Sequence, residues 1–168
     1  MTVTNFINVI PLDDISLCDD LVALFHKNKS HHSQGQVLDN GVKETIENKE
    51  IKDSTDLSIL WEESERITTI KKYQEELIEQ VRKYGYEYEI IQNLKMDFTE
   101  SFNIQFYKPK GGYRSWHFER NHNTQGRAFA FMTYLNDVPK GGTEFYYQGM
   151  TTQAKKGDTV IWPAEWTH

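Results

Sequence analysis

The fold is decided by the stretch RAFAFMTYLN at residues 127–136, in which large and small apolar side chains alternate. In an extended chain Phe129 and Phe131 share one face, while Ala130, Met132 and Tyr134 share the other. The phenylalanine face suits a core, and the small side chains of the opposite face leave room beside the Tyr134 hydroxyl. This alternation predicts a strand over residues 127–135.

Further short strands surround this one between Phe98 and His168. Turn sequences rich in Gly, Asn and Asp separate them, and β-branched and aromatic residues fill them. The predicted strands are residues 102–106, 113–119, 127–135, 143–148, 151–154 and 159–162. Many short strands of this kind predict a β-sandwich or barrel.

The first half of the chain has a different pattern. Apolar residues from Leu17 to Phe25 recur at helical spacing behind Asp13 and Asp14, which predicts a helix of about four turns. A second helix is predicted from Leu60 to Tyr84, with Gly85 as its stop. The polar segment 27–56 is expected to be a mobile connection or a lid. The buried stripe predicted for the second helix is Ile67, Ile70, Leu77, Val81 and Tyr84.

Length and composition restrict the class of protein. The 168 residues suit one domain, since single domains usually have about 100–200 residues. Residues 1–97 form a predicted helical and acidic N-terminal layer, and residues 98–168 form the β core with 8 basic and 6 acidic side chains. No apolar run could span a bilayer, and no basic stretch begins a signal peptide. The one cysteine, Cys18, is expected to be buried, and a cytoplasmic location is expected.

A histidine and a carboxylate lie two positions apart in one of the predicted strands. His117 and Glu119 therefore point to the same face, where they could hold two positions of a metal ion. His168, just beyond the last predicted strand, is the candidate third ligand. His-x-Glu alone is a weak signal, and an exposed strand pair without metal is the alternative.

Five ordered segments make residues 102–168 similar to the 2-oxoglutarate- and Fe(II)-dependent dioxygenases, in their prolyl 4-hydroxylase-like branch. The segment around His117 resembles the family's His-x-Asp motif, and the segment before it, starting at Tyr107, resembles its Tyr-x-x-Gly motif. Residues 133–136 resemble its Tyr-Leu-Asn strand, residues 141–145 its Gly-Gly strand, and residues 156–163 its Lys-Gly-Asp strand before the distal histidine.

The resemblance implies a mainly β fold with N-terminal helices, in which a double-stranded β-helix, or jelly-roll, core is buttressed by at least two helices. It implies Fe(II) on His117, Glu119 and His168, and 2-oxoglutarate as co-substrate beside Tyr107 and Tyr134, with Thr143 as a further contact. Ascorbate would be the compatible reductant. For Tyr107 and Tyr134 the alternative is a packed tyrosine whose hydroxyl bonds elsewhere.

Two positions depart from the family pattern. Glu119 stands in place of the usual Asp, and the family's basic partner for the far carboxylate of 2-oxoglutarate falls about ten residues beyond the distal histidine. The sequence ends at His168, so the domain is expected to continue beyond it. Arg127, Lys155 and Lys156 are the remaining candidates for that partner.

The resulting prediction is a dioxygenase that hydroxylates an unactivated C–H bond and releases succinate and CO₂, with a prolyl residue in a peptide as the first choice of substrate and a small metabolite as the second. The alternatives are a non-catalytic jelly roll that binds metal or a partner, and a cupin-like metalloenzyme without 2-oxoglutarate. A net charge of −6 argues against nucleic acid as a partner, and no membrane partner is expected. An oligomer is compatible with the sequence but is not indicated by it.

Overall fold

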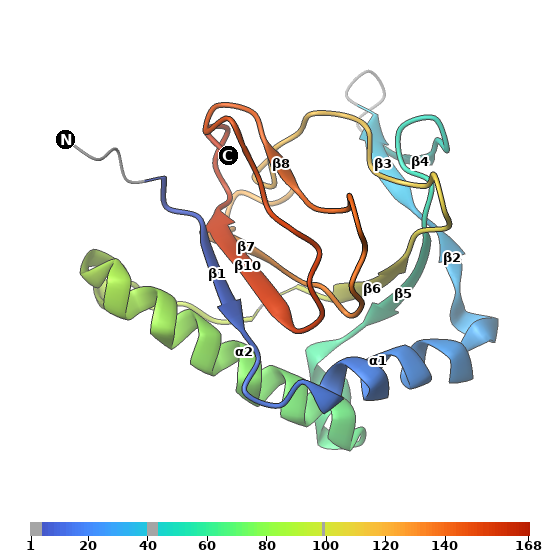
Figure 1. Ribbon diagram of the computed structural model, residues 1–168, viewed down its shortest axis with the longest axis horizontal. Helices are drawn as coiled ribbons and strands as arrows, with labels where there is room; N and C mark the ends of the chain where they lie inside the picture. Colours follow the sequence, from blue (N-terminus) through green and yellow to red (C-terminus); the bar gives the residue numbers. More distant parts are fainter. Residues whose placement is uncertain (1–4, 40–43, 99) are drawn as a thin grey trace.

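The computed structural model describes residues 5–39, 44–98 and 100–168 (Figure 1). Its two α-helices are α1 (Ser16–Lys27) and α2 (Thr68–Glu87), and three 3₁₀ turns are η1 (Lys29–His31), η2 (Trp61–Glu65) and η3 (Glu89–Asn93). The strands of the first half are β1 (Asn8–Pro11), β2 (Ser33–Gln34), β3 (Gln36–Asp39), β4 (Glu44–Glu47) and β5 (Thr55–Ile59). Those of the second half are β6 (Phe102–Phe106), β7 (Phe129–Thr133), β8 (Glu144–Phe145), β9 (Met150–Thr151) and β10 (Asp158–Pro163).

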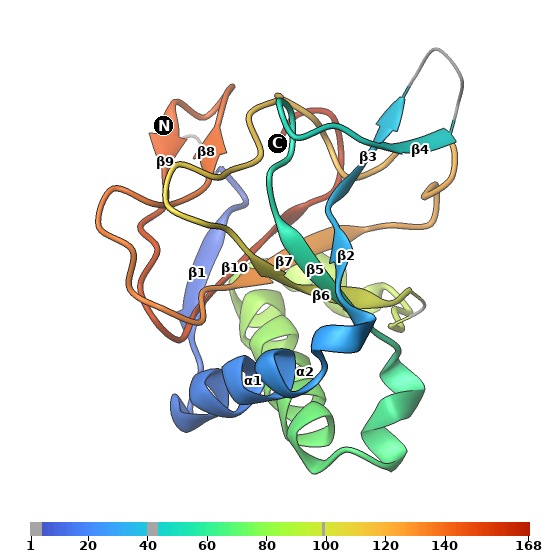
Figure 2. The same ribbon diagram turned by 90° about the vertical axis from the view of Figure 1, so that its right-hand side faces the viewer.

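Two antiparallel three-stranded sheets form the centre of the molecule. The first has the order β1-β10-β7, with Val9 opposite Val160 and Met132 opposite Val160 on the other side. The second has the order β2-β5-β6, with Leu57 opposite Ile104, and its strands lie side by side in Figure 2. Each sheet therefore combines both halves of the chain: β1 pairs with a strand of the second half in one sheet, and β5 pairs with β6 in the other.

Two hairpins complete the β structure. The β3–β4 hairpin pairs Gln36 with Glu47, and the β8–β9 hairpin pairs Phe145 with Met150. The chain is mainly β with two helices, as predicted. Among the described residues, the hydrogen-bonded ladders form these two sheets and two hairpins and do not close into two four-stranded sheets.

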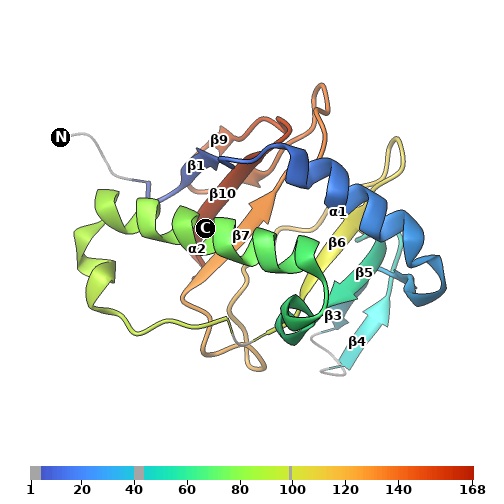
Figure 3. The same cartoon turned by 90° about the horizontal axis from the view of Figure 1, so that it is seen from below.

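Both helices cover one side of the sheets, as seen from below in Figure 3. The apolar stripe of α1 is buried at Leu17, Cys18, Leu21 and Phe25, so the prediction of a buried Cys18 is confirmed. In α2 the residues Ile70, Leu77 and Tyr84 are buried. Burying a side chain of this size stabilises the fold by about 1.5–3 kcal/mol.

Three clusters of buried side chains form the core; one contains Ile7, Phe145, Val160 and Trp162, and the helices contribute to the other two. Leu21, Phe25, Ile70 and Tyr73 of the helices pack on Leu57 and its neighbours in the β2-β5-β6 sheet. Tyr84 packs on Ile10 and Ile161 of the β1-β10-β7 sheet, with Phe129 and Phe131 against it. The core side predicted for the two phenylalanines is thus confirmed. Neither helix of the described chain is long and apolar enough to cross a membrane.

The second helix differs from its prediction at both ends. Residues 61–65 form the separate turn η2, and α2 begins only at Thr68. At the other end α2 continues past Gly85 to Glu87, so the predicted stop at Gly85 is wrong. Gly85 is buried under η3, and a Cβ there would lie 3.6–3.7 Å from Gln92 and Ile91, an ordinary contact, so the fold-back of that turn does not require glycine.

The N-terminal layer is not purely helical, and segment 27–56 is not a plain connection. Strands β1 to β5 all lie before Asp97, and β2, β3, β4 and the start of β5 lie within residues 27–56. The polar composition misled the prediction because the β3–β4 hairpin lies at the outside of the molecule, where β3 has one buried apolar side chain, Val37. The tip of this hairpin, residues 40–43, lies outside the described residues.

Candidate functional site

The predicted strand at residues 113–119 is the clearest error in the second half. Tyr113 makes an isolated bridge with Lys52, and the rest of the segment has no strand structure. The Arg114 amide donates to the Ile51 carbonyl, whereas the Arg120 amide donates to the Ala164 carbonyl. Because the two ends of the segment bond to different parts of the chain, no single neighbouring strand can form a ladder with it.

His117 and Glu119 nevertheless face each other, with 3.5 Å between His117 Nε2 and Glu119 Oε1. His117 Nδ1 lies 2.8 Å from the Ser115 carbonyl oxygen, so Nδ1 carries the hydrogen and donates it. In the neutral ring, the lone pair is then on Nε2, on the side of the carboxylate. Histidines that bind metals commonly donate their second ring N–H to a carbonyl in this way.

The charges around the pair favour a cation between its two members. Burial opposes the charged form of His117, but the facing Glu119 carboxylate and the Ser115 carbonyl outweigh it and raise the His117 pKa. Burial likewise opposes the charged form of Glu119, but His117, Arg127 and Lys52 together lower the Glu119 pKa. Two lone pairs that face each other across a gap are stabilised by a proton or a metal ion in that gap.

Two further residues hold the pair in place. The Tyr113 ring stacks on the His117 ring with 4.0 Å between the centroids. Arg127 Nη1 donates to Glu119 Oε2 at 3.2 Å and to the Glu119 carbonyl at 3.0 Å. Arg127 also forms a bidentate ion pair with Glu100. It is thus committed to carboxylates of the chain itself.

The third predicted ligand, His168, does not reach this pair. Its Nε2 lies 2.8 Å from the Asn5 carbonyl, and its Nδ1 lies 2.9 Å from the Thr167 hydroxyl. The carbonyl requires a hydrogen on Nε2, so Nδ1 accepts from Thr167 and no ring lone pair is left. Across the described part of the chain, no group of three His, Cys, Asp or Glu side chains could hold a metal ion.

The fit to an iron centre is therefore incomplete. Two ligands at about 2.1 Å from a metal and at right angles are about 3 Å apart, which is close to the separation of Nε2 and Oε1. His117 and Glu119 fit such a centre, whereas His168 does not fit it in this arrangement. The predicted set of three ligands is not assembled.

The predicted co-substrate residues form two separate groups. Tyr134 Oη lies 2.8 Å from the hydroxyls of both Thr143 and Thr152, so the structure brings Tyr134 and Thr143 together. Tyr107 Oη instead donates to Gln105 Oε1 at 3.1 Å. Burial raises the Tyr107 pKa to about 12, so its hydroxyl keeps its hydrogen at neutral pH.

A buried ion pair near the candidate site was not predicted. Lys52 and Asp56 are each 6% exposed, and Lys52 Nζ lies 2.9 Å from Asp56 Oδ2. Ser54 Oγ donates to Asp56 Oδ1 at 2.7 Å. The positions 52, 54 and 56 have the period of two that places side chains on one face of an extended chain. No signal in the sequence separates these three residues from their neighbours, because residues 52–56 are all polar.

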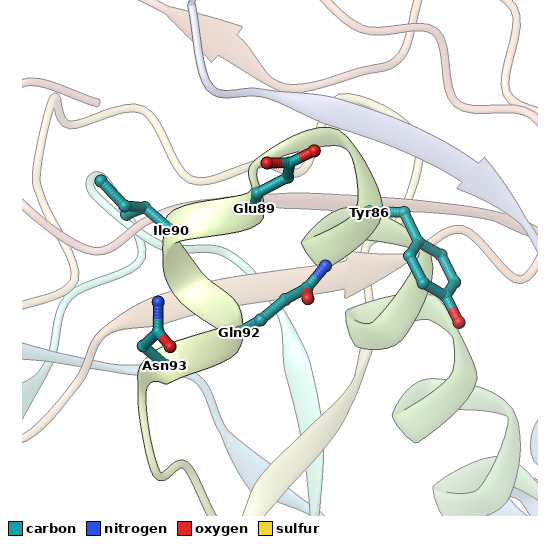
Figure 4. Close-up of a pocket in the computed structure, with 5 residues that line it drawn as sticks. All are labelled: Tyr86, Glu89, Ile90, Gln92 and Asn93. Atoms are coloured by element: carbon teal, nitrogen blue, oxygen red, sulfur yellow. The ribbon is translucent and has the colours of Figure 1, made fainter.

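The remaining basic candidates lie elsewhere. Lys156 forms an exposed ion pair with Asp19 of α1, and Lys155 is exposed. A hollow at the end of α2 is lined by Tyr86, Glu89, Ile90, Gln92 and Asn93 (Figure 4). None of these five residues belongs to the candidate site.

Comparison with solved structures identifies the fold, whereas comparison of the sequence with family models and curated proteins finds no match. Among solved structures, the chain is similar to the crystal structure of a Pseudomonas putida prolyl-4-hydroxylase, with a TM-score of 0.65 and 16% identity over 96% of this chain and 82% of that chain. At this identity the similarity shows the fold, which is prolyl-4-hydroxylase-like.

Proposed function

We propose that this protein is a dioxygenase of the prolyl 4-hydroxylase-like kind, dependent on Fe(II) and 2-oxoglutarate. The observation that carries the proposal is the His117–Glu119 pair, whose facing atoms are 3.5 Å apart in a prolyl-4-hydroxylase-like fold. When bound, iron and 2-oxoglutarate would supply the oxidation of an unactivated C–H bond, with succinate and CO₂ as co-products and ascorbate as a compatible reductant.

The residues of the chain would have distinct roles. His117 and Glu119 would hold two positions of the metal, and Arg127 would keep the Glu119 carboxylate in place. Tyr107 keeps its hydroxyl hydrogen at neutral pH and donates it to Gln105, so it would donate to a carboxylate of the co-substrate in exchange for that bond. Tyr134 is held between two threonine hydroxyls, so its position is determined before any ligand arrives.

His168 would complete the metal site only after its ring leaves the Asn5 carbonyl. The ring is engaged through both nitrogens, and one of these hydrogen bonds is internal to residues 167–168. Breaking the bond to Asn5 and rotating the ring would return a lone pair to a nitrogen. Each hydrogen bond of this kind contributes about 0.5–1.5 kcal/mol, which a metal–nitrogen bond can offset.

A row of exposed aromatic rings supports a peptide as the substrate. The rings are Trp116, Tyr146, Tyr147 and Trp166, each more than half exposed, and successive centroids lie 5.2, 5.2 and 6.1 Å apart in edge-to-face contacts. Trp116 directly precedes His117, and Trp166 lies two positions before His168. Proline-rich segments in the polyproline II conformation dock on aromatic surfaces of this kind, which favours a prolyl residue in a peptide.

One observation favours a second candidate function. His168 is turned to Asn5, so two of the three predicted ligands, His117 and Glu119, face each other. With this arrangement the chain could bind a metal or a partner protein without turnover. In that case His117 and Glu119 would still bind a divalent cation, weakly.

Succinate production separates the two functions. The protein is loaded with Fe(II) and 2-oxoglutarate without oxygen, oxygen is admitted, and succinate is measured beside His117→Ala. An Arg120→Ala variant is the matched control, because Arg120 forms an exposed ion pair with Glu165 outside the pair of ligands. Succinate from wild type and control but not from His117→Ala supports the dioxygenase. No succinate above the His117→Ala background, with cation binding retained in wild type, supports the non-catalytic alternative.

A further inference from the structure

Gln148 connects the β8–β9 hairpin to the segment that carries His168. It lies in the turn between the two strands of the hairpin. Its side-chain Nε2 donates to the Thr167 carbonyl at 2.7 Å, and this carbonyl belongs to the peptide bond that precedes His168. The Gln148 amide therefore lies beside the backbone from which the third predicted metal ligand projects.

The oxygen of the same amide is buried and unsatisfied. Among the described residues, Gln148 Oε1 has no hydrogen-bond partner. A buried carbonyl oxygen without a donor costs free energy, because it has given up its hydrogen bonds to water. Reversing the amide does not remove this cost, since Oε1 would then face the Thr167 carbonyl, which is also an acceptor. Gln148 Oε1 can thus accept a hydrogen bond without giving up another.

The His168 ring is held in the tautomer that leaves no lone pair for a metal. Its Nε2 donates to the Asn5 carbonyl at 2.8 Å, and its Nδ1 lies 2.9 Å from the Thr167 hydroxyl. A neutral imidazole has one N–H, so a lone pair on Nε2 requires the hydrogen on Nδ1. Nδ1 is the ring nitrogen nearer the backbone, which is the side on which Gln148 is bonded. The Thr167 hydroxyl can rotate away, so it does not prevent this change.

We infer that Gln148 is a positioning residue for His168. In a second state of the ring, Gln148 Oε1 accepts the hydrogen of His168 Nδ1, and the Nε2 lone pair is left for a metal ion, which is that of the proposed function on which this inference rests. His117 already has this arrangement, because its Nδ1 donates to the Ser115 carbonyl and its Nε2 faces the carboxylate. Such a bond fixes the tautomer and the orientation of a metal-binding histidine.

The second state exchanges one hydrogen bond for another. The ring gives up the bond to the carbonyl of Asn5, a partly exposed residue, and gains a bond to an oxygen that is fully buried. The number of hydrogen bonds made by the ring stays the same, so a metal ion that binds only the second state needs little free energy to select it.

The competing role for Gln148 is to hold the Thr167 carbonyl and nothing more. Two substitutions separate the roles. Gln148→Glu keeps an acceptor oxygen but loses the donor to Thr167, whereas Gln148→Met has a similar length and loses both. The positioning role predicts that metal affinity falls in Gln148→Met and is retained in Gln148→Glu. A purely structural role predicts equal losses. Gln125→Met is the matched control, because Gln125 Nε2 also donates to a backbone carbonyl, that of His122, in an exposed turn.

Nitrogen-15 NMR of the histidine rings, with Zn(II) as a diamagnetic probe, tests the inference without turnover. The His168 signals are assigned by their loss in His168→Ala. Without metal, the His168 hydrogen should be on Nε2. With Zn(II), it should be on Nδ1 and protected from exchange with water, because Gln148 Oε1 is buried. Calorimetry should show that Gln148→Met lowers Zn(II) affinity about 10–100-fold, while Gln148→Glu and Gln125→Met keep the wild-type affinity. Thermal unfolding confirms that each variant is folded.

The outcomes separate this inference from the proposed function. Equal losses of Zn(II) affinity in Gln148→Glu and Gln148→Met overturn the positioning role, even where the iron-loaded protein produces succinate. A His168 hydrogen that stays on Nε2 after addition of Zn(II) overturns it as well. The change to a protected Nδ1 hydrogen without any succinate production supports the positioning role and overturns the dioxygenase. If a Gln148 variant does not fold, an Nδ1 hydrogen of the wild type that exchanges freely with water overturns the positioning role by itself.

Discussion

The two histidines of the predicted metal site are held in opposite ways. His117 donates its Nδ1 hydrogen to the Ser115 carbonyl, two residues away, and this leaves Nε2 with a lone pair facing Glu119. His168 donates its Nε2 hydrogen to the Asn5 carbonyl, 163 positions away, and its Nδ1 accepts from Thr167. The imidazole of His117 therefore has a lone pair that is not engaged by a donor among the described residues, whereas both ring nitrogens of His168 are engaged in hydrogen bonds. Local backbone contacts make the difference for His117, and the N-terminal segment makes it for His168.

The largest effect should come from the ligands themselves. We expect His117→Ala to lower the affinity for Co(II) or Mn(II) by more than about 100-fold, because removing residues that only orient a ligand already costs 10–100-fold. His168→Ala should cost less, because its ring must first leave Asn5. Metal titration followed by absorbance or calorimetry measures both. Equal losses in the two variants would show that the two histidines contribute alike.

The next effect concerns the residue that holds Glu119. Arg127→Ala removes the hydrogen bonds to the Glu119 carboxylate and carbonyl, so metal affinity should fall by about 10–100-fold while the two ligands stay in place. Arg120→Ala, which breaks only the exposed pair with Glu165, is the matched control and should change metal affinity less than about twofold. A similar loss in both variants would contradict a positioning role for Arg127.

A smaller effect is expected from a variant that loosens the N-terminal segment, whose Asn5 carbonyl accepts the hydrogen bond from His168. The Tyr84 hydroxyl donates to the Phe6 carbonyl at 2.7 Å, next to the Asn5 carbonyl that holds His168. Tyr84→Phe should lower the free energy of unfolding by about 1 kcal/mol, measured by urea denaturation, since it removes one buried hydrogen bond. Metal affinity should stay equal or rise, because a looser segment releases His168 more easily. A fall in metal affinity would argue that Asn5 positions His168 for the metal.

The smallest effect is on the pH dependence of stability. The His117 pKa is raised above 6.5, so the protonated ring stabilises the fold below about pH 6.5 and this contribution is lost as the pH rises through the folded pKa. The Glu119 pKa is lowered below 4.5, so its contribution is present above about pH 4.5 and is lost as the pH falls through the folded pKa. The stability difference between wild type and His117→Gln should therefore be larger at pH 5.5 than at pH 8. Urea denaturation of both proteins at the two pH values measures it, and a difference independent of pH would contradict the coupling.

The sequence predicted the C-terminal strands better than the N-terminal ones. Alternation located β6 at Phe102–Phe106, and β7 and β10 within a few residues of their observed bounds. It failed for segment 113–119, which has the alternation of a strand but bonds at its two ends to different parts of the chain. The sequence also failed to predict β3 and β4. Their polar side chains suit the outside of the molecule, and their composition is similar to that of a loop.

The sequence by itself determined the pair His117 and Glu119, because residues two positions apart are neighbours in almost any extended backbone. It also determined the buried faces of α1 and β7, since the period of apolar residues is a local property. Only the tertiary structure decided where His168 points and that Lys52 lies buried behind the pair. Both depend on contacts between distant parts of the chain, Asn5 with His168 and Gly35 with Lys52, and no local pattern records which backbone will cover a given side chain.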